Sequence, residues 1–123
     1  MRLHGILKAA GEPTRLRILN LLRRGGVCVC DLQAILDLPQ HRVSRHLAAL
    51  RHAGLVRDER NGQRVIYSLA PPTTAALKAV RRLLDECCPD EEILQSDLRR
   101  LRQAVRRGQC AVSEFREKET LAS

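Results

Sequence analysis

Apolar residues in the first half of the chain recur with the period of a helix, in short runs separated by glycine or proline. Residues three or four apart share one face of a helix, so each run predicts a short amphipathic helix. In the last run Val43, Leu47 and Leu50 form the apolar face, and Gly54 ends it. The expected helices cover residues 6–10, 13–24, 31–37 and 41–53.

The spacing of apolar residues along the chain changes after residue 54. The stretch LVRDERNGQRVIYSLA, residues 55–70, reads as two strands joined at Asn61 and Gly62, a pair that favours a tight type I′ hairpin. Val65, Tyr67 and Leu69 alternate along the second strand, which predicts that they share one face. Short helices followed by a two-stranded ribbon predict a winged helix-turn-helix, a mainly α fold with a small β-hairpin.

Two further helices are expected in the remainder of the chain. Pro71 and Pro72 open the first, and the second runs from Asp90 towards Gly108. The first helix has an apolar stripe that we expect to pack on a second copy of the chain or on the helix at 6–10, and its members are Leu77, Val80, Leu83 and Leu84. The predicted divisions are a main domain over 1–88, a C-terminal helix over 89–108 and a flexible tail over 109–123.

The charge balance narrows the possible partners. The chain has 123 residues, with 22 Lys and Arg against 14 Asp and Glu and a net charge of +8. Such an excess attracts a polyanion such as nucleic acid or an acidic membrane surface. No stretch approaches the roughly 20 apolar residues of a membrane span, and we expect a soluble cytoplasmic protein. The sequence holds no Walker, HExxH or GxSxG motif, so we do not expect an enzyme.

The helix at 41–53 and the hairpin tip carry side chains suited to DNA. With its apolar face buried, the helix can place the opposite face in a major groove about 12 Å wide, and that face holds His41, Arg42, Ser44, Arg45 and Ala48. Arginine contacts guanine edges or phosphates, and serine bonds to either. The tip suits backbone or minor-groove contact and consists of Arg60, Asn61, Gly62, Gln63 and Arg64. The main domain is therefore expected to bind double-stranded DNA and to dimerise.

Four segments, in chain order, carry a family resemblance: EPTRLRILNLL, VCVCDL, VSRHLAALRHAGLV and RNGQRVIYSL. Over residues 6–70 the chain resembles the ArsR/SmtB family of metal-responsive bacterial repressors, and CVCDL resembles its arsenic-responsive and cadmium/lead-responsive members. The resemblance implies a homodimer that binds an inverted repeat ahead of a resistance operon and leaves it when a metal or metalloid binds. The chain departs from the family at Pro39 and His41, where members often carry Ser and Pro. It also has Gln33 where arsenic-responsive members often carry a third cysteine.

Cys28 and Cys30 flank one residue just before the expected helix at 31–37. The unsatisfied N–H groups and the dipole of a helix start stabilise a thiolate, the form that coordinates soft metals. On a regular helix two such residues point about 200° apart, so they can hold one ion only where the segment is extended or unwound. We therefore expect ligand binding to distort the start of this helix. That distortion would couple ligand binding to the position of the helix at 41–53, which is expected to read the DNA.

The other cysteines leave several possibilities open. Five cysteines cannot all pair within one chain, and a reducing cytosol disfavours disulfides, so metal binding or redox chemistry is favoured over a disulfide scaffold. Trivalent arsenic or antimony favours three thiolates, and the third could be Cys87, Cys88 or Cys110 of either subunit, or an exogenous thiol such as glutathione. Those three cysteines could instead form a separate site, or Cys87 and Cys88 could be small residues at a helix end.

The resemblance also narrows the inducer. Cadmium/lead members use additional cysteines ahead of the first helix, where Met1 to Lys8 holds none, and zinc members use histidines on the dimer helix, where no His follows His52. The expected function is thus repression of an arsenic-resistance operon with As(III) or Sb(III) as inducer and no cofactor for folding. The alternatives are a repressor on the same scaffold whose thiols sense oxidation, and an architectural DNA-binding protein with inert cysteines.

Overall fold

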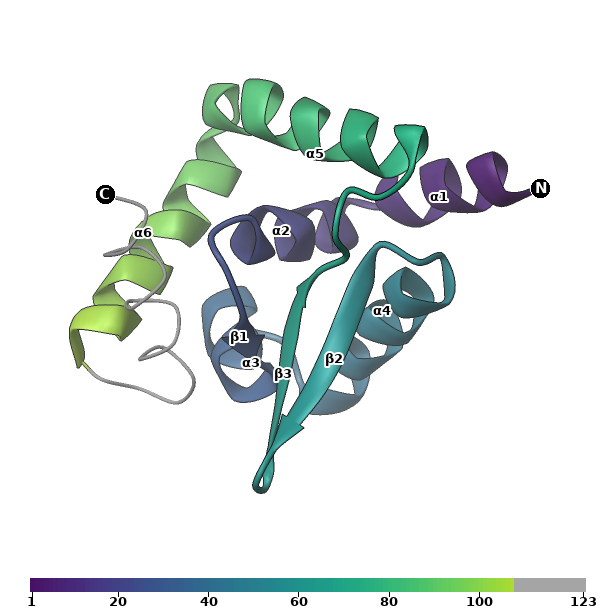
Figure 1. Cartoon of the computed structure of the whole chain (residues 1–123). Coiled ribbons are helices and arrows are strands. Elements are labelled where there is room, and N and C mark those ends of the chain that lie inside the picture. The colour runs from purple at the N-terminus through teal and green to yellow at the C-terminus, as the bar shows by residue number, and fades with distance from the viewer. Residues whose placement is uncertain (108–123) are drawn as a thin grey trace.

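The computed structural model describes residues 1–107, in which a bundle of helices carries a small three-stranded sheet (Figure 1). The elements, in chain order, are α1 (Arg2–Ala10), α2 (Pro13–Leu22), β1 (Val27–Cys28), α3 (Val29–Leu36), α4 (Gln40–His52), β2 (Val56–Asn61), β3 (Arg64–Leu69), α5 (Ala75–Cys87), the 3₁₀ turn η1 (Cys88–Asp90) and α6 (Glu92–Arg107). The predicted tail at 109–123 lies outside the described residues. No helix of the described part is long and apolar enough to cross a membrane.

Two helices, α2 and α5, begin at a residue whose side chain caps them. Pro13 occupies the first turn of α2, and the Glu12 carboxylate accepts a 2.8 Å hydrogen bond from the backbone N–H of Arg15. The expectation that Pro71 and Pro72 open the next long helix is wrong, because α5 starts at Ala75. Proline disfavours the helical region for the residue that precedes it. The helix begins instead after Thr74, whose hydroxyl caps it by accepting a 3.2 Å hydrogen bond from the Leu77 N–H.

The sheet has the order β1-β3-β2, and all its strands are antiparallel. The pairing of Asn61 with Arg64 leaves Gly62 and Gln63 as the two-residue turn. Only Gly62 has a positive φ (66°) in this turn, so the predicted type I′ turn is wrong: a positive φ at the first central residue alone is the pattern of type II′. The sequence pattern also missed β1, which is only two residues long and pairs Cys28 with Ile66.

One hydrophobic core contains residues from all six described α-helices. The predicted apolar face of α4 is fully buried, and α6 adds Leu94, Leu98 and Leu101 to the same core. The expected common face of β3 is only partly observed. Tyr67 and Leu69 pack against the core, whereas the buried residue of the strand is Ile66, which lies on the other face with Cys28.

Polar contacts fasten α6 to α2 and α3. The fully buried Asp97 carboxylate accepts two hydrogen bonds from the Arg17 guanidinium, at 2.8 and 2.9 Å, and this pairing raises the pKa of Arg17. The buried Asn20 amide donates to the Leu94 carbonyl at 3.0 Å. Arg100 donates from Nη1 to the Ile35 carbonyl at 2.7 Å, so α6 holds the C-terminal end of α3. None of these anchors was predicted from the sequence, because each joins residues far apart in the chain.

Candidate DNA-binding surface and cysteine site

The helix α4 separates its two faces as the sequence predicted. Val43, Leu47 and Leu50 are buried, and the five residues proposed for base reading are all exposed, namely His41, Arg42, Ser44, Arg45 and Ala48. The turn before α4 is short: Asp37 ends α3 in the left-handed region (φ 54°), and Pro39 is the N-cap residue of α4. Two helices joined by so short a turn form the helix-turn-helix unit, in which the second helix enters the major groove.

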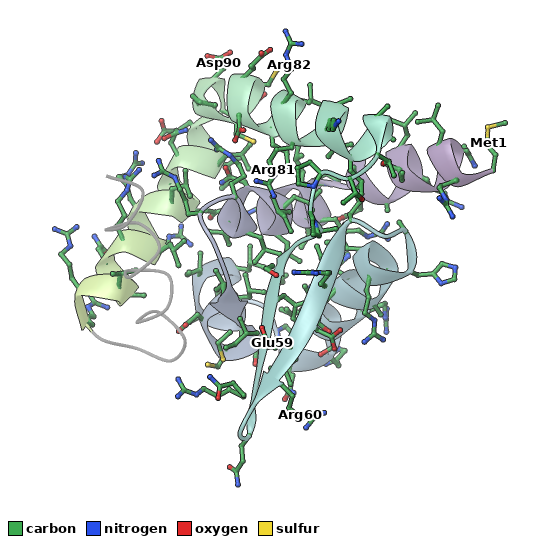
Figure 2. All side chains as sticks on the ribbon, viewed as in Figure 1. Met1, Glu59, Arg60, Arg81, Arg82 and Asp90 are labelled. Carbon is green, nitrogen blue, oxygen red and sulfur yellow. The ribbon has the colours of Figure 1, made fainter. Side chains whose placement is uncertain are left out.

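The β2–β3 ribbon forms the wing and projects from the body at the end opposite α5 (Figure 1). All five predicted tip residues, from Arg60 to Arg64, are exposed. Figure 2 shows Arg60 near the wing tip, whereas Arg81 and Arg82 of α5 lie at the other end of the molecule. Arg51 of α4 donates to Asp58 of β2 at 3.2 Å, which ties the wing to the recognition helix.

Behind the recognition helix, His46 has a structural role. Its Nδ1 accepts a 3.2 Å hydrogen bond from Arg15 Nε and lies 3.7 Å from the Glu12 carboxylate. Burial lowers the pKa of His46, so the imidazole is neutral at pH 7 and accepts this bond. These contacts connect α2 to α4 and fix the orientation of α4. The other helix histidine, His52, is exposed.

Cys28 and Cys30 lie at the junction of β1 and α3, with their Sγ atoms 2.8 Å apart. The buried Cys28 has an extended backbone (φ −71°, ψ 146°), and the helix begins at the next residue. Because only Cys30 lies on the helix, chelation does not require the helix distortion that the sequence predicted. Two thiolates about 2.3 Å from one ion lie roughly 3.3–3.8 Å apart, so about 1 Å of movement would suffice.

An open groove of about 390 Å³ connects the sulfur pair to the DNA-binding elements. Cys28 and Cys30 line one side of this groove, and the recognition helix and the wing supply the others, through Gln40, Ser44, Gln63, Arg64, Val65 and Tyr67. Three of these residues, Ser44, Gln63 and Arg64, belong to the predicted DNA-contact set. The sequence alone could not reveal the groove, since its walls come from three separate segments.

Asp31, next to Cys30, is a buried carboxylic acid without a full set of partners. The residue is 4% exposed, and its Oδ2 has no hydrogen-bond partner within the described residues. Burial raises the pKa of Asp31, and the nearby Arg64 of the wing partly offsets that shift. Sequence reasoning assigned Asp31 only to the helix dipole and missed both its burial and its link to the wing.

Cys87 and Cys88 do not form a comparable pair. Cys87 is exposed at the end of α5, whereas Cys88 is buried in η1. Burial raises the pKa of Cys88, and Arg23 partly offsets the shift, so its thiolate is disfavoured. Within residues 1–107 no group of three or more His, Cys, Asp or Glu side chains could hold a metal. Neither cysteine lines the groove, and Cys110 lies outside the described residues.

The predicted dimerisation stripe divides between the core and the surface. Leu84 is buried, and Leu77 and Val80 pack against the core of the same chain. Leu83 is 57% exposed, as are Leu3 and Leu7 of α1 to a similar extent. Of the four residues predicted to contact a partner, Leu83 therefore exposes the most surface, while Leu77 and Val80 are partly exposed.

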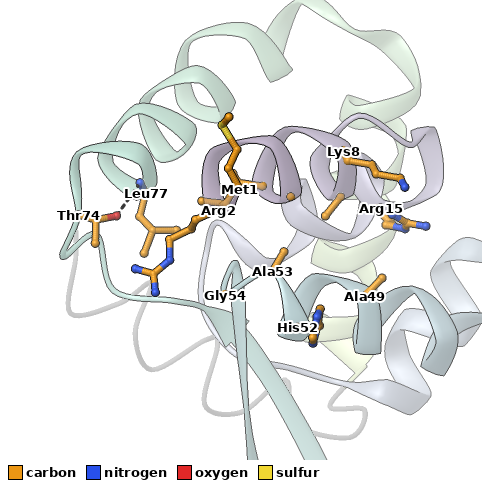
Figure 3. A pocket seen from close by; sticks show the side chains of 13 residues that line it. Met1, Arg2, Lys8, Arg15, Ala49, His52, Ala53, Gly54, Thr74 and Leu77 are labelled. Carbon is orange, nitrogen blue, oxygen red and sulfur yellow. Dashed lines mark hydrogen bonds between the residues drawn. The ribbon is translucent and has the colours of Figure 1, made fainter.

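A larger cavity than this groove, about 680 Å³, lies between α1 and the end of α4 (Figure 3). Its polar lining includes Arg2, Lys8, Arg15 and His52, and none of the described residues around it is a cysteine. Soft metals prefer thiolate ligands, so this cavity does not suit the predicted inducer. Size alone therefore does not identify the thiol site.

An exposed recognition helix on a buried apolar face, followed by a projecting ribbon, defines a winged helix-turn-helix DNA-binding regulator. The family "Bacterial regulatory protein, arsR family" matches residues 12–58. The chain is 37% identical over 109 residues to the "Arsenic resistance transcriptional regulator ArsR1" of Pseudomonas putida, covering 88% of this chain and 84% of that protein. The chain belongs to the arsR family.

Two other relatives agree with this assignment. The "Arsenical resistance operon repressor" of Escherichia coli K12 is 41% identical over 93 residues, which cover 72% of this chain and 75% of that protein. A solution structure of a homodimeric winged helix-turn-helix domain from Mycobacterium bovis, described as a possible ArsR-family transcriptional regulator, matches with a TM-score of 0.60 and 29% identity over 69% of this chain and 73% of that one. The predicted family and fold class are confirmed. Members of this family are DNA-binding regulators and not enzymes, as predicted.

Proposed function

We propose that this chain represses an arsenic-resistance operon and leaves its operator when As(III) or Sb(III) binds Cys28 and Cys30. The observation that carries the proposal is the convergence of the two sulfur atoms, 2.8 Å apart, on a groove shared with the recognition helix and the wing. The names of the relatives from P. putida and E. coli support arsenic as the inducer. DNA and reduced thiols meet in the cytoplasm, where we place the protein.

Operator binding is assigned to the exposed face of α4 and to the wing tip. Arg42 and Arg45 project from the half of α4 that enters a major groove, where a guanidinium can bond two acceptors of guanine. Arg60 and Arg64 lie on either side of the Gly62 turn and suit contacts to phosphate or the minor groove. Each subunit of a homodimer then reads one half of an inverted repeat.

Release follows from the shared groove. An ion held by Cys28 and Cys30, together with its third ligand, occupies space beside Ser44 and Arg64, two side chains that the DNA also requires. The inducer therefore favours a position of the wing and α4 that binds DNA less well. A coupling free energy of about 1–3 kcal/mol between the two sites corresponds to a roughly 5–150-fold loss of affinity.

The third ligand comes from outside the described groove. Cys87 or Cys110 of either subunit, or an exogenous thiol such as glutathione, could complete three thiolates around As(III). Cys88 is the weakest candidate, because it is buried in η1 and burial raises the pKa of its thiol. The open side of the groove leaves room for any of the other three.

A homodimer is proposed on two grounds. The M. bovis domain, which has a similar fold, is homodimeric. In this chain, Leu3 and Leu7 of α1 and Leu83 of α5 expose more than half of their surface, and contact with a second copy would remove that surface from water.

A thiol redox switch is the second candidate, because Cys28 and Cys30 place two sulfur atoms 2.8 Å apart. Operator binding measured by fluorescence anisotropy under reducing conditions separates the candidates. We expect arsenite to release the wild-type protein, and we expect a Cys28→Ser/Cys30→Ser variant to bind DNA equally well but to ignore arsenite. Cys88→Ala is the matched control, because its buried thiol is the weakest candidate ligand, and it should respond like the wild type. Release by oxidant alone would favour the redox switch, and no response to either would favour inert cysteines.

A further inference from the structure

The second half of α6 carries a concentration of positive charge. Glu92 lies in its first turn, whereas five arginines follow, at Arg99, Arg100, Arg102, Arg106 and Arg107. Arg99 pairs with Glu92 at 2.8 Å. The other four are exposed, and none of them pairs with a carboxylate of residues 1–107. This uncompensated charge is not explained by the packing of α6.

These four arginines divide between two faces of the helix. Arg107 follows Arg100 by seven residues, which is about 20° short of two full turns, so the two share a face. Arg102 and Arg106 are turned more than about 100° away from Arg100. The helix therefore presents two arginine pairs of equal charge in different directions.

The face of Arg100 and Arg107 adjoins the helix-turn-helix. Arg100 donates to the Ile35 carbonyl at 2.7 Å, at the C-terminal end of α3. Only three residues, 37–39, separate α3 from α4, whose N-terminal residues face the bases. In such a unit the first helix crosses the DNA backbone, so side chains beside its end lie close to phosphates.

We propose that Arg100 and Arg107 form a phosphate-binding stripe that extends the operator contact beyond the recognition helix and the wing. The inference rests on the proposed function, because it assumes that α4 and the wing dock on DNA. A guanidinium has five N–H donors, so Arg100 can hold Ile35 and a phosphate together. Through Arg100 the same phosphate also braces α3, the helix that carries Cys30.

The test compares the two arginine pairs on one helix. Arg100→Gln/Arg107→Gln and Arg102→Gln/Arg106→Gln remove the same charge, and Arg107→Gln alone leaves the bond to Ile35 intact. Affinity is measured against salt concentration for a duplex enriched by the wild-type protein from a random pool, and for an unrelated duplex. The slope of log affinity against log salt should fall by about 0.9 for each phosphate that the protein no longer neutralises. We therefore expect a fall of about 1.8 for Arg107→Gln in a dimer, with both duplexes weakened alike and the Arg102/Arg106 variant close to the wild type.

Equal slopes for the two double variants, or no change in Arg107→Gln, would overturn the stripe. Thermal unfolding of each variant shows whether weaker DNA binding results from unfolding of the protein. Arg42→Ala/Arg45→Ala separates the two proposals, since it should abolish the preference for the enriched duplex. If Arg42→Ala/Arg45→Ala loses the preference for the enriched duplex but the two α6 double variants have equal salt slopes, only the proposal of the stripe fails. If the wild-type protein prefers no duplex, the proposed function fails as well.

Discussion

Cysteine pairs and buried aspartates are arranged differently at the two ends of the molecule. At the groove, the sulfurs of Cys28 and Cys30 converge, and the buried Asp31, next to Cys30 in the chain, keeps an oxygen without a partner among the described residues. Where α5 meets α6, Cys87 and Cys88 diverge, one exposed and one buried, and within α6 the buried Asp97 accepts two hydrogen bonds from Arg17 of α2. A polar group left unsatisfied is costly and is retained where it serves function, whereas full pairing indicates a structural role. We therefore propose that the groove is the responsive end of the molecule and that the α6 anchor is the fixed end.

The largest effect is expected at the fixed end. Asp97→Ala leaves the Arg17 guanidinium without its partner against α6, and removing one member of a buried ion pair costs about 3–5 kcal/mol. Urea unfolding should show this loss. Arg82→Ala, which breaks the exposed pair with Glu86, should change the free energy of unfolding by less than about 1 kcal/mol. Similar losses in the free energy of unfolding for the two variants would contradict the contrast between the buried Arg17–Asp97 contact and the exposed Arg82–Glu86 pair.

The apolar surface of α5 should show the next effect. Leu83→Glu is expected to weaken the dimer at least tenfold in sedimentation experiments without unfolding the chain, because burial of one leucine contributes about 1.5–3 kcal/mol. The adjacent Leu84 is buried, so Leu84→Glu should instead unfold the protein. A wild-type chain that stays monomeric at every concentration would exclude the dimer.

At the responsive end, the removal of the cysteine pair should change induction and little else. We expect arsenite to lower the operator affinity of the wild type roughly 5–150-fold and that of Cys28→Ser/Cys30→Ser not at all. Cys88→Ala should keep full induction and lose some stability, since it opens space in the core. Induction that depended on Cys88 and not on Cys28 would reverse the assignment of the two ends.

The smallest effect concerns Asp31. Because burial raises its pKa in the folded state, the protonated form is favoured there. Its contribution to stability is present below the ordinary pKa of about 3.9 and is lost as pH rises through the folded value. The side chain of Asp31→Asn stays neutral at every pH. Its free energy of unfolding should therefore rise relative to that of the wild type as pH rises from about 4 towards 7. A constant difference over that range would mean that Asp31 titrates normally.

The sequence predicted the elements better than the contacts between them. The helical spacing of Val43, Leu47 and Leu50 located the buried face of α4, because periodicity reports directly on burial. It could not locate β1, which is too short to show alternation, and β1 is what gives Cys28 its extended backbone. It also could not find the bond between Arg17 and Asp97, eighty residues apart. Local pattern thus found the cysteine pair, while only tertiary packing could show the groove that the pair faces.

The most direct test of the central claim is the arsenic coordination in the protein–arsenite complex, measured by crystallography at the arsenic absorption edge. The account predicts arsenic within bonding distance of the sulfurs of both Cys28 and Cys30, in the groove beside Ser44 and Arg64, with α3 still beginning at Val29. Arsenic bound by Cys87 and Cys88, with the groove empty, would contradict it.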